Sequence, residues 1–433
     1  MTIWSQSTQT SWSGRARPLT TRGYLYMIKT RGAIVLISTL AVFATACGSK
    51  SKAADTTVAA ADTTVAGVDT TAAGAVDTTV APAADTTVAG AATTAVAAVE
   101  TTVAAAAAAG GGGKAGFILP DSKSSVRWEG FDRKFIGAAC TAAGIECDIQ
   151  NAEGDKAKMA TIADQMITSG VKVLAIVDLD SESGAAIQKK AAEAGVKNID
   201  YDRLTLGGAA DAYVSFDNVA VGTAQGEGII KCLGGADAAK GKKIIQLHGS
   251  PTDNNATLFK QGYQDAIKSS GIVTVAEEAV PDWDNTKGGQ IFEQLLTKAG
   301  GKVDGVLVAN DGLSLAAQAV LTKNGLTIPT TGQDASRDGL AAILKGTQCM
   351  TVYKAVKAEA EGAVATAVSL LKGEKPTAAT TINNKTADIP YVQIPVKAIY
   401  KDNVKDVVAD GFVTKEELCT GDIAALCTAA GIS

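Results

Sequence analysis

Histidine is nearly absent from this 433-residue chain, which contains only His248. With one histidine, neither a histidine-based catalytic triad nor a metal site built from several imidazoles is expected. Basic residues are not in excess: 40 Lys and Arg stand against 45 Asp and Glu, so the formal net charge is -5 at pH 7. The chain therefore lacks the basic surface that nucleic-acid binding requires. His248 itself, without partner ligands, is expected to pack in a loop or between lobes rather than act as a base.

Cysteine is also scarce, at seven residues. Seven cysteines are too few for a disulfide scaffold, yet they suffice for a few bridges in an exported protein. The length exceeds what a single hydrophobic core usually serves, so two domains with additional segments are expected.

Long apolar runs are missing except near the start, where residues 32–43 follow Lys29 and Arg31. This stretch is too short to span a bilayer permanently and is typical of a signal peptide. It ends in small residues before Cys47, a pattern that resembles a bacterial lipobox and implies lipidation of Cys47. An ordinary signal peptide with a chance cysteine is the alternative. Residues 1–46 form the signal region, and Met27 already opens a complete signal.

Residues 47–113 consist almost entirely of Ala, Thr, Val, Asp and Gly, with ADTTVA repeated from Ala54, Ala61 and Ala84. Such a segment buries too little apolar surface to offset its ordering entropy, so a disordered tether is expected. A flexible coil of about 65 residues reaches roughly 45 Å root-mean-square. Low-complexity drift without a function predicts the same disorder.

From Lys114 onward, short apolar runs alternate with amphipathic segments. The expected strands are 115–119, 171–177, 196–201, 242–248, 272–280, 303–309 and 326–332. The expected helices are about 126–143, 155–169, 183–194, 219–233, 254–270, 286–299, 312–324, 337–345 and 355–372. This alternation predicts an α/β fold of two doubly wound, Rossmann-like lobes with parallel sheets covered on both faces.

Polar and aromatic side chains follow almost every expected strand, at the edge where open α/β sheets bind their ligands. They are Arg127, Trp128, Asp202, Arg203, Asp253, Asn254, Asn255, Trp283, Asn310, Asp311, Asp334 and Lys354. Carboxylates accept hydrogen bonds, Arg and Lys donate them, and Asn does both. Tryptophan offers a flat apolar face to the C–H side of a sugar ring. The set therefore predicts a site for a sugar.

Helix capping is the competing interpretation of each single position. Asp253 or Asn254 could simply cap the helix that follows. We expect Asp253 to cap the turn. Capping alone does not account for the whole set.

Several segments resemble the D-xylose-binding proteins of bacterial ABC importers, which belong to the type I periplasmic sugar-binding family. They are YDR (201–203), SFDN (215–218), GSPTDNNATLF (249–259), ANDG (309–312), GQDAS (332–336), GTQCMTVYKAV (346–356), TINN (381–384) and KDNVKDVVADGFVTKEEL (401–418). The resemblance implies two lobes joined by three hinge crossings that close on a pyranose. It assigns 114–217 with about 354–382 to the N-terminal lobe and 218–353 with about 383–410 to the C-terminal lobe. Residues 411–433 form a tail.

The same resemblance implies which side chains hold the sugar. Those expected to hydrogen-bond it are Arg127, Asp202, Arg203, Asn254, Asn255, Asn310, Asp334 and Lys354, while Trp128 and Trp283 sandwich the ring. D-xylose is the expected ligand, with ribose, arabinose and glucose as alternatives. No cofactor or metal is expected.

The resemblance implies an ABC permease with a separate ATPase subunit as the partner. The lipid anchor implies a location on the outer face of the cytoplasmic membrane, or else in the periplasm. GGADAAKGKK (234–243) lacks the P-loop spacing, so the chain carries no ATPase of its own. We expect a monomer. A receptor-coupled sugar sensor is an alternative to the importer.

Two other classes of protein fit the sequence less well. A glycosidase could use Asp202 and Asp334 as its carboxylate pair, but their basic and amide neighbours favour ionised acceptors over a protonated acid. A sugar-responsive repressor would need a basic helix-turn-helix instead of a signal and an acidic-neutral tether. We therefore predict a binding protein rather than an enzyme.

The remaining cysteines permit several pairings. Cys140 with Cys147, and Cys419 with Cys427, are close enough in sequence for local disulfides. Cys232 and Cys349 are expected to be buried thiols.

Overall fold

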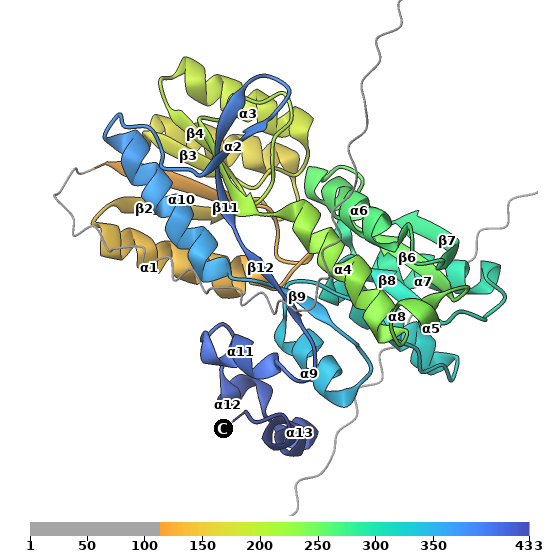
Figure 1. The fold of residues 1–433 in the computed structure, drawn as a ribbon. Coiled ribbons are helices and arrows are strands. Elements are labelled where there is room, and N and C mark those ends of the chain that lie inside the picture. Colours follow the sequence, from red (N-terminus) through yellow and green to blue (C-terminus); the bar gives the residue numbers. More distant parts are fainter. Residues whose placement is uncertain (1–112, 433) are drawn as a thin grey trace, which may run out of the picture. The chain divides into compact units, whose positions relative to one another are not determined.

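The computed structural model describes residues 113–432. The expected signal region, Cys47 and the tether through residue 112 lie outside the described residues. Within 113–432, a seven-stranded and a three-stranded sheet form two α/β lobes (Figure 1). The predicted fold class of two doubly wound lobes is therefore confirmed. In this part of the chain, no helix has the length and apolarity needed to cross a membrane.

The N-terminal lobe is built on a sheet with the strand order β10-β11-β5-β4-β3-β1-β2. Only β10 runs antiparallel to its neighbour. The strands are β1 (Lys114–Leu119), β2 (Glu146–Asn151), β3 (Val173–Ile176), β4 (Lys197–Tyr201), β5 (Ala212–Phe216), β10 (Thr380–Asn383) and β11 (Asp388–Ile394). The helices are η1 (Trp128–Asp132), α1 (Arg133–Ala143), α2 (Lys156–Thr168), α3 (Ser181–Glu193) and α10 (Val356–Leu371).

Alternate side chains of the central strands enter two different cores. Phe117 and Ala175 belong to the cluster formed with α1 and α10, whereas Ile118 and Ile176 belong to the cluster formed with α2 and α3. Because both faces are covered, β1 and β3 read as continuous apolar runs in the sequence. Edge strand β2 buries only Asn151, which explains why no apolar run predicted it.

The C-terminal lobe contains the parallel sheet β7-β6-β8 and the antiparallel pair β12-β9. The strands are β6 (Lys243–His248), β7 (Val273–Ala279), β8 (Gly305–Val308), β9 (Thr351–Lys354) and β12 (Val396–Ile399). The helices are α4 (Asn218–Cys232), α5 (Ala236–Ala239), α6 (Asn254–Ile267), η2 (Pro281–Trp283), α7 (Asn285–Lys298), α8 (Asp311–Lys323) and α9 (Arg337–Lys345).

The strand predicted over 326–332 is wrong. This segment makes only an isolated bridge between Thr330 and Val306. Pro329 accepts a hydrogen bond from the Val306 amide, but it has no N–H of its own to continue a ladder. The segment therefore follows β8 without becoming a regular strand.

Three crossings connect the lobes, between β5 and α4, between β9 and α10, and between β11 and β12. The first lies between Phe216 and Asn218, and the second between Lys354 and Val356. The third was placed too early, at about residue 382, because β11 pairs with β5 and so belongs to the N-terminal sheet. The chain leaves that sheet after Ile394 and starts to pair with β9 at Val396. TTIN and DIPYVQI offered no long apolar run by which the sequence could assign them.

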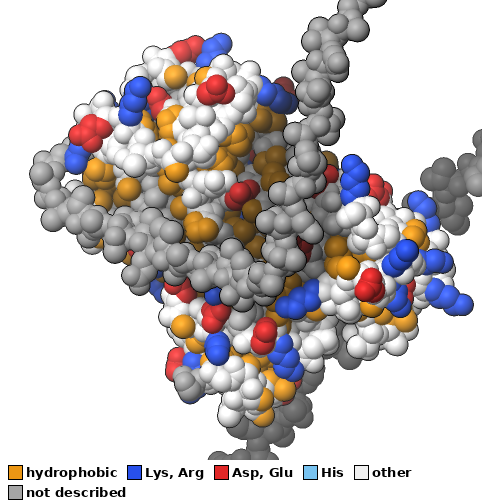
Figure 2. Space-filling model, in the orientation of Figure 1, with side chains coloured by type: hydrophobic (Ala, Val, Ile, Leu, Met, Phe, Trp, Pro, Cys, Tyr) orange, Lys and Arg blue, Asp and Glu red, His pale blue; other side chains and the backbone are white. Residues whose placement is uncertain are grey.

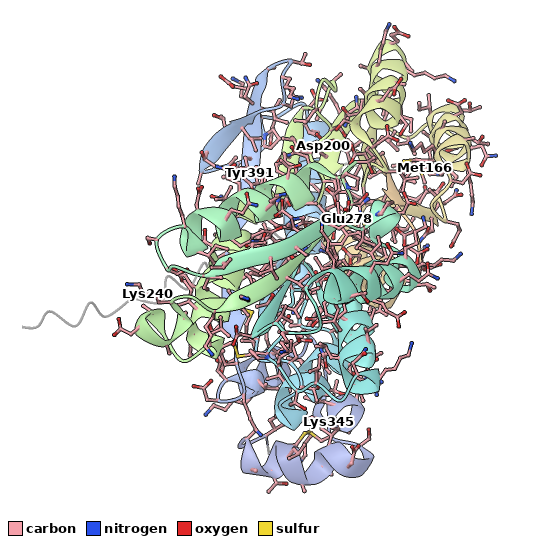
Figure 3. The ribbon with its side chains drawn as sticks, turned by 90° about the vertical axis from the view of Figure 1, so that its right-hand side faces the viewer. Met166, Asp200, Lys240, Glu278, Lys345 and Tyr391 are labelled. Carbon is pink, nitrogen blue, oxygen red and sulfur yellow. A yellow bond between two sulfur atoms is a disulfide. The ribbon has the colours of Figure 1, made fainter. Side chains whose placement is uncertain are left out.

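The expected tail is a packed segment. It contains α12 (Lys415–Leu418), η3 (Gly421–Ile423) and α13 (Ala424–Ala429), and it follows α11 (Val404–Ala409). Its apolar side chains pack against α9. Lys345 of α9, labelled in Figure 3, forms an ion pair with Asp422 at 2.9 Å. Phe412 stacks on Phe131 of η1 with ring centroids 4.4 Å apart, so this segment also contacts the N-terminal lobe.

Three disulfides join the described cysteines. Cys140–Cys147 and Cys419–Cys427 confirm the two local pairs. The expectation that Cys232 and Cys349 are thiols is wrong, because they form a third disulfide between the end of α4 and the residue two before β9. Their separation of 117 residues gave no local signal in the sequence.

Candidate ligand-binding site

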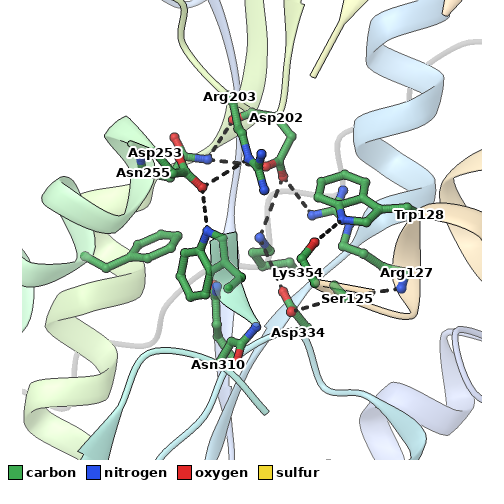
Figure 4. Close-up of a pocket in the computed structure, with 14 residues that line it drawn as sticks. Ser125, Arg127, Trp128, Asp202, Arg203, Asp253, Asn255, Asn310, Asp334 and Lys354 are labelled. Carbon is green, nitrogen blue, oxygen red and sulfur yellow. Dashed lines mark hydrogen bonds and ion pairs between the residues drawn. The ribbon is translucent and has the colours of Figure 1, made fainter. Parts of the chain in front are cut away.

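A cavity of about 320 Å³, including its opening, lies between the lobes at the carboxyl ends of the strands (Figure 4). All side chains expected to hold the sugar line it except Asn254, and Asp311 of the strand-end set does not line it either. Sequence reasoning missed Ser124, Ser125, Phe259 and Gln333, and it assigned Asp253 to capping alone. The loop serines adjoin Arg127 and Trp128, and Gln333 adjoins Asp334, so adjacency to a predicted residue was the available signal.

Trp128 and Trp283 reach this cavity from different lobes. The Trp128 indole N–H donates to Ser124 Oγ at 3.0 Å, and the Trp283 indole N–H donates to Asp253 Oδ2 at 3.0 Å. Both indole N–H groups are therefore engaged, which leaves the apolar ring surfaces to contact a ligand. Phe259 packs edge-on against Trp283, with centroids 6.4 Å apart.

Three residues that line the cavity have left-handed backbone conformations. The φ angles of Asp202, Trp283 and Asp334 are 60°, 54° and 94°. Non-glycine residues rarely adopt such angles, and the strain is concentrated at functional sites. Gly249 is required beneath Trp283, because a Cβ there would lie 2.0 Å from the indole ring. The backbone is thus held in unfavourable conformations that present these side chains.

Arg127 lies in a buried network in the N-terminal lobe. Its guanidinium donates to both carboxylate oxygens of Asp132, at 2.7 and 2.9 Å, and to Asp202 at 2.7 Å. It also donates to Glu359 at the start of α10. Burial opposes the charged form, yet the three carboxylates raise the pKa of Arg127 well above its ordinary value. The cation is therefore fixed in place by protein groups.

The carboxylates of this network differ in the direction of their pKa shifts. Burial raises the pKa of Asp132 and of Glu359, even though Arg127 favours their ionised forms. Burial also opposes ionisation of Asp202, but Lys354, Arg127 and Arg203 lower its pKa to about 2. Asp202 therefore faces the cavity as an anion, whereas the pKa values of the two carboxyls behind it are shifted upward.

Asn255 and Asp253 occupy the start of α6, but their polar atoms are already engaged. Asn255 Nδ2 donates to the Asp202 carbonyl at 2.9 Å, and its Oδ1 accepts from Asn218 and Tyr213 at 3.0 and 3.3 Å. Asp253 caps α6 by accepting from the Asn255 amide at 2.9 Å, as predicted, and also accepts from Trp283. Asp253 therefore both caps α6 and lines the cavity.

Asn254 is wrongly placed by the sequence interpretation. It is partly exposed at the first position of α6 and does not line the cavity. Successive helical residues point about 100° apart, and at the start of α6 Asn255 is the one that faces the cavity.

Four predicted residues retain polar atoms that can still bind a ligand. Asn310 caps α8 through Oδ1, which leaves its amide N–H groups, and Arg203 donates one Nη1 hydrogen to the Asp178 carbonyl. Asp334 has no donor for Oδ1 within hydrogen-bond geometry among residues 113–432. Lys354 Nζ lies 3.4 Å from Asp334 and 3.7 Å from Asp202. The last two pairs are longer than normal charge-assisted hydrogen bonds.

Several contacts join the lobes across the cavity. Arg203 Nε lies 3.0 Å from Asp253 Oδ2, and Asn255 bonds the Asp202 carbonyl. Ser125 also approaches Asp334 at 3.4 Å. The lobes are therefore in a closed arrangement in which both contribute to one cavity.

His248 and the strongly shifted acids lie elsewhere. His248 contacts Tyr263 and Glu277, and burial lowers its pKa to about 4. Burial raises the pKa of Asp200 to about 7, but it is hydrogen-bonded to Gln188 and Thr205 and does not line the cavity. Among residues 113–432, no group of three metal-ligating side chains is assembled. On the face shown in Figure 2, acidic and basic side chains are interspersed.

Comparisons with known proteins agree with this geometry. The chain is 33% identical over 312 residues to the D-xylose-binding periplasmic protein of Escherichia coli, covering 70% of this chain and 92% of that protein. It is 32% identical to the multiple sugar-binding periplasmic receptor ChvE of Rhizobium radiobacter, covering 69% and 90%. These relatives are named as binding proteins and not as enzymes.

Solved structures give the same result. A solute-binding protein from Clostridium phytofermentans with bound β-D-glucose is 26% identical, with a TM-score of 0.66, and covers 70% of this chain and 99% of its own. One from Chloroflexus aurantiacus in complex with D-glucose is 27% identical, with a TM-score of 0.63, covering 70% and 97%. A family model described as periplasmic binding protein domain matches residues 115–375. The chain therefore belongs to the periplasmic binding protein family.

Proposed function

We propose that this protein captures a monosaccharide, D-xylose, outside the cytoplasmic membrane and delivers it to an ABC importer. The observation that carries the proposal is one cavity in which two indoles from different lobes accompany charged and amide groups with remaining hydrogen-bonding capacity. This combination suits the apolar face and the hydroxyl edge of a pyranose. The relatives named for D-xylose support the choice of sugar.

Capture follows from the way the two lobes share the site. A sugar that contacts both lobes adds interactions only in the closed form, so it shifts the population toward closure. Trp128 and Trp283 would cover the two ring faces, while Asn310, Asp334, Lys354 and Arg203 bind hydroxyls. A permease with its own ATPase would then recognise the closed form. A sensor role is the second candidate, favoured by the similarity to the receptor ChvE.

Membrane attachment through a lipidated Cys47 is part of the proposal. The small residues before Cys47 and the long Ala/Thr-rich stretch after it support an anchored domain on a tether. Incorporation of labelled palmitate should depend on Cys47, and Cys47→Ser should release the protein into the soluble fraction. Labelling of Cys47→Ser at the wild-type level would contradict the anchor.

The test of the function is a titration with D-xylose, D-ribose, L-arabinose and D-glucose. Thermal unfolding should shift upward with the cognate sugar, because ligand at about 100 times its Kd stabilises by about 2.7 kcal/mol. Calorimetry should give one site, with D-xylose bound tightest. Trp283→Ala should lose binding, whereas Asn254→Ala, at the start of α6 and outside the cavity, should keep it. Failure of all four sugars to bind would overturn the proposal.

A further inference from the structure

Gln333 is a cavity residue that neither the sequence pattern nor the family resemblance assigned. Its side chain is 3% exposed and lines the cavity next to Asp334. Its backbone is fixed, because the Gln333 carbonyl accepts from the Asp311 amide at 3.0 Å and the preceding Gly332 carbonyl accepts from Gln225 at 3.2 Å. The backbone from which the side chain extends is therefore fixed at the cavity wall.

The side-chain oxygen of Gln333 is buried, and no donor from residues 113–432 reaches it. A buried acceptor without a partner costs about 1–3 kcal/mol. Exchanging the amide oxygen and nitrogen would leave an unpaired donor instead of an unpaired acceptor. Because Gln333 lines the cavity, a hydroxyl placed there can supply the missing hydrogen bond.

The other cavity amides differ. Asn255 engages both its oxygen and its nitrogen with protein groups, and Asn310 uses its oxygen as the cap of α8. Gln333 is thus the cavity amide whose acceptor remains available. Asp334 Oδ1 beside it is also without a donor, and Lys354 Nζ lies 3.4 Å from that oxygen. The two neighbouring acceptors favour a ligand with hydroxyl donors on this edge.

We propose that Gln333 is a specificity-determining residue that accepts a hydrogen bond from a sugar hydroxyl on the edge facing Asp334. The inference rests on the proposed sugar-binding function and adds the requirement for a hydroxyl at one ring position. A site built to pair a hydroxyl discriminates strongly against an analogue that lacks it, because the protein acceptor is then left unpaired. A deoxy sugar at this position should therefore be rejected.

The test is a cycle between protein variants and ligand analogues, measured by calorimetry on the purified protein. The ligands are the tightest-binding sugar and its monodeoxy analogues, and the variants are Gln333→Met and Gln333→Glu. The wild type should bind one deoxy analogue at least about tenfold more weakly than the parent sugar. Gln333→Met should lose most of this discrimination at that position alone. Gln333→Glu, which keeps an acceptor, should retain it.

The control is Gln318→Met, because Gln318 lies on α8 outside the cavity and bonds Ser314, Thr330 and Gln348. This variant should keep the wild-type discrimination. Equal discrimination by wild type and Gln333→Met at every ring position would overturn the inference while leaving sugar binding intact. Absence of binding to every sugar by the wild type would overturn the proposed function together with this inference.

Discussion

The two walls of the cavity use polar residues differently. On the N-terminal wall, Arg127 and Asp202 are tied to each other and to the carboxylates behind them. On the C-terminal wall, Gln333, Asp334 and Lys354 have long contacts or none within residues 113–432. Each wall has an exception, because Asp253 and Asn255 on the C-terminal wall are engaged with protein groups, and Arg203 on the N-terminal wall keeps N–H groups that can still bind a ligand. A position in the cavity is therefore not sufficient to identify a ligand-binding group. The remaining hydrogen-bonding capacity separates groups that hold the site together from groups that recognise the ligand.

The largest expected effect on stability comes from a substitution in the N-terminal wall. Arg127→Met removes the cation shared by Asp132, Asp202 and Glu359 and leaves buried carboxylates without their partner. The free energy of unfolding should fall by about 3–5 kcal/mol, as measured by urea denaturation without sugar. A variant that is as stable as the wild type but fails to bind sugar would place Arg127 among the recognition groups instead.

The C-terminal wall depends on the disulfide that fixes β9. Replacing both Cys232 and Cys349 by serine removes a covalent link across 117 residues, just before the strand that carries Lys354. The free energy of unfolding should fall by about 2–4 kcal/mol, because the unfolded chain gains entropy. Thermal denaturation with and without reductant measures this. Reductant should destabilise the wild type and also cleave the two local disulfides, so the double variant isolates this bridge. An unchanged melting temperature in the double variant would exclude a stabilising role.

Asp334→Asn tests recognition on the C-terminal wall without disturbing the N-terminal network. Loss of a charged acceptor should weaken sugar binding by about 10–100-fold, since hydrogen bonds to charged groups contribute about 1.5–3 kcal/mol. Calorimetry measures the affinity, and the sugar-free melting temperature should change little. A large loss of stability with retained affinity would mean that Asp334 holds the structure together and does not recognise the ligand.

Stability should depend on pH in the same direction in both lobes. Burial raises the pKa of Asp200 in the N-terminal lobe and of Asp311 in the C-terminal lobe from 3.8 to about 7. The native state therefore holds protons that the unfolded chain releases above about pH 4, so stability falls as pH rises toward 7. Asp202, with a pKa of about 2, acts oppositely below pH 4, and His248, with a pKa of about 4, opposes part of the decline up to about pH 6.5.

Melting temperatures in sugar-free buffer at pH 5, 7 and 9 measure this dependence. The highest value is expected at pH 5, and Asp200→Asn should flatten the decline. A melting temperature that rises steadily to pH 9 would contradict the protonated state of these buried acids.

The smallest effect on affinity and stability is expected for one of two neighbouring asparagines. Asn254→Ala should change both affinity and stability by less than about 0.5 kcal/mol, as is usual for surface positions. Asn255→Ala should weaken both, because Asn255 joins Asp202 to Tyr213 and Asn218. Parallel calorimetry and thermal unfolding of the two variants compare them. A greater loss of binding in Asn254→Ala would restore the sequence-based assignment.

Much of the framework follows from local sequence. The helix predicted over 337–345 has those bounds in the structure, because Ser336 caps it and Gly346 ends it in a left-handed conformation. Burial on both faces made β1, β3 and β6 readable as apolar runs. Edge strand β2 lacked that signal, and Pro329 prevented a ladder that the apolar residues around it suggested.

The residues that line the site were largely predictable, but which of them are engaged with protein groups and which are available to a ligand was not. Strand ends revealed where polar residues converge, because parallel strands bring their carboxyl ends to one edge. Whether Asn255 is available for a ligand depends on Tyr213, Asn218 and Asp202, which lie far from it in sequence. The partnerless oxygen of Gln333 and the pairing of Cys232 with Cys349 likewise arise only from tertiary contacts.

The most direct test of the account is a crystal structure of the protein with the sugar that titration identifies as its ligand. The account predicts a pyranose between Trp128 and Trp283, with hydroxyls bonded to Gln333, Asp334 and Lys354, while the bonds from Arg127 to Asp132 and Glu359 persist. A sugar bound elsewhere, or one held mainly by Arg127 after it has left its carboxylates, would contradict it.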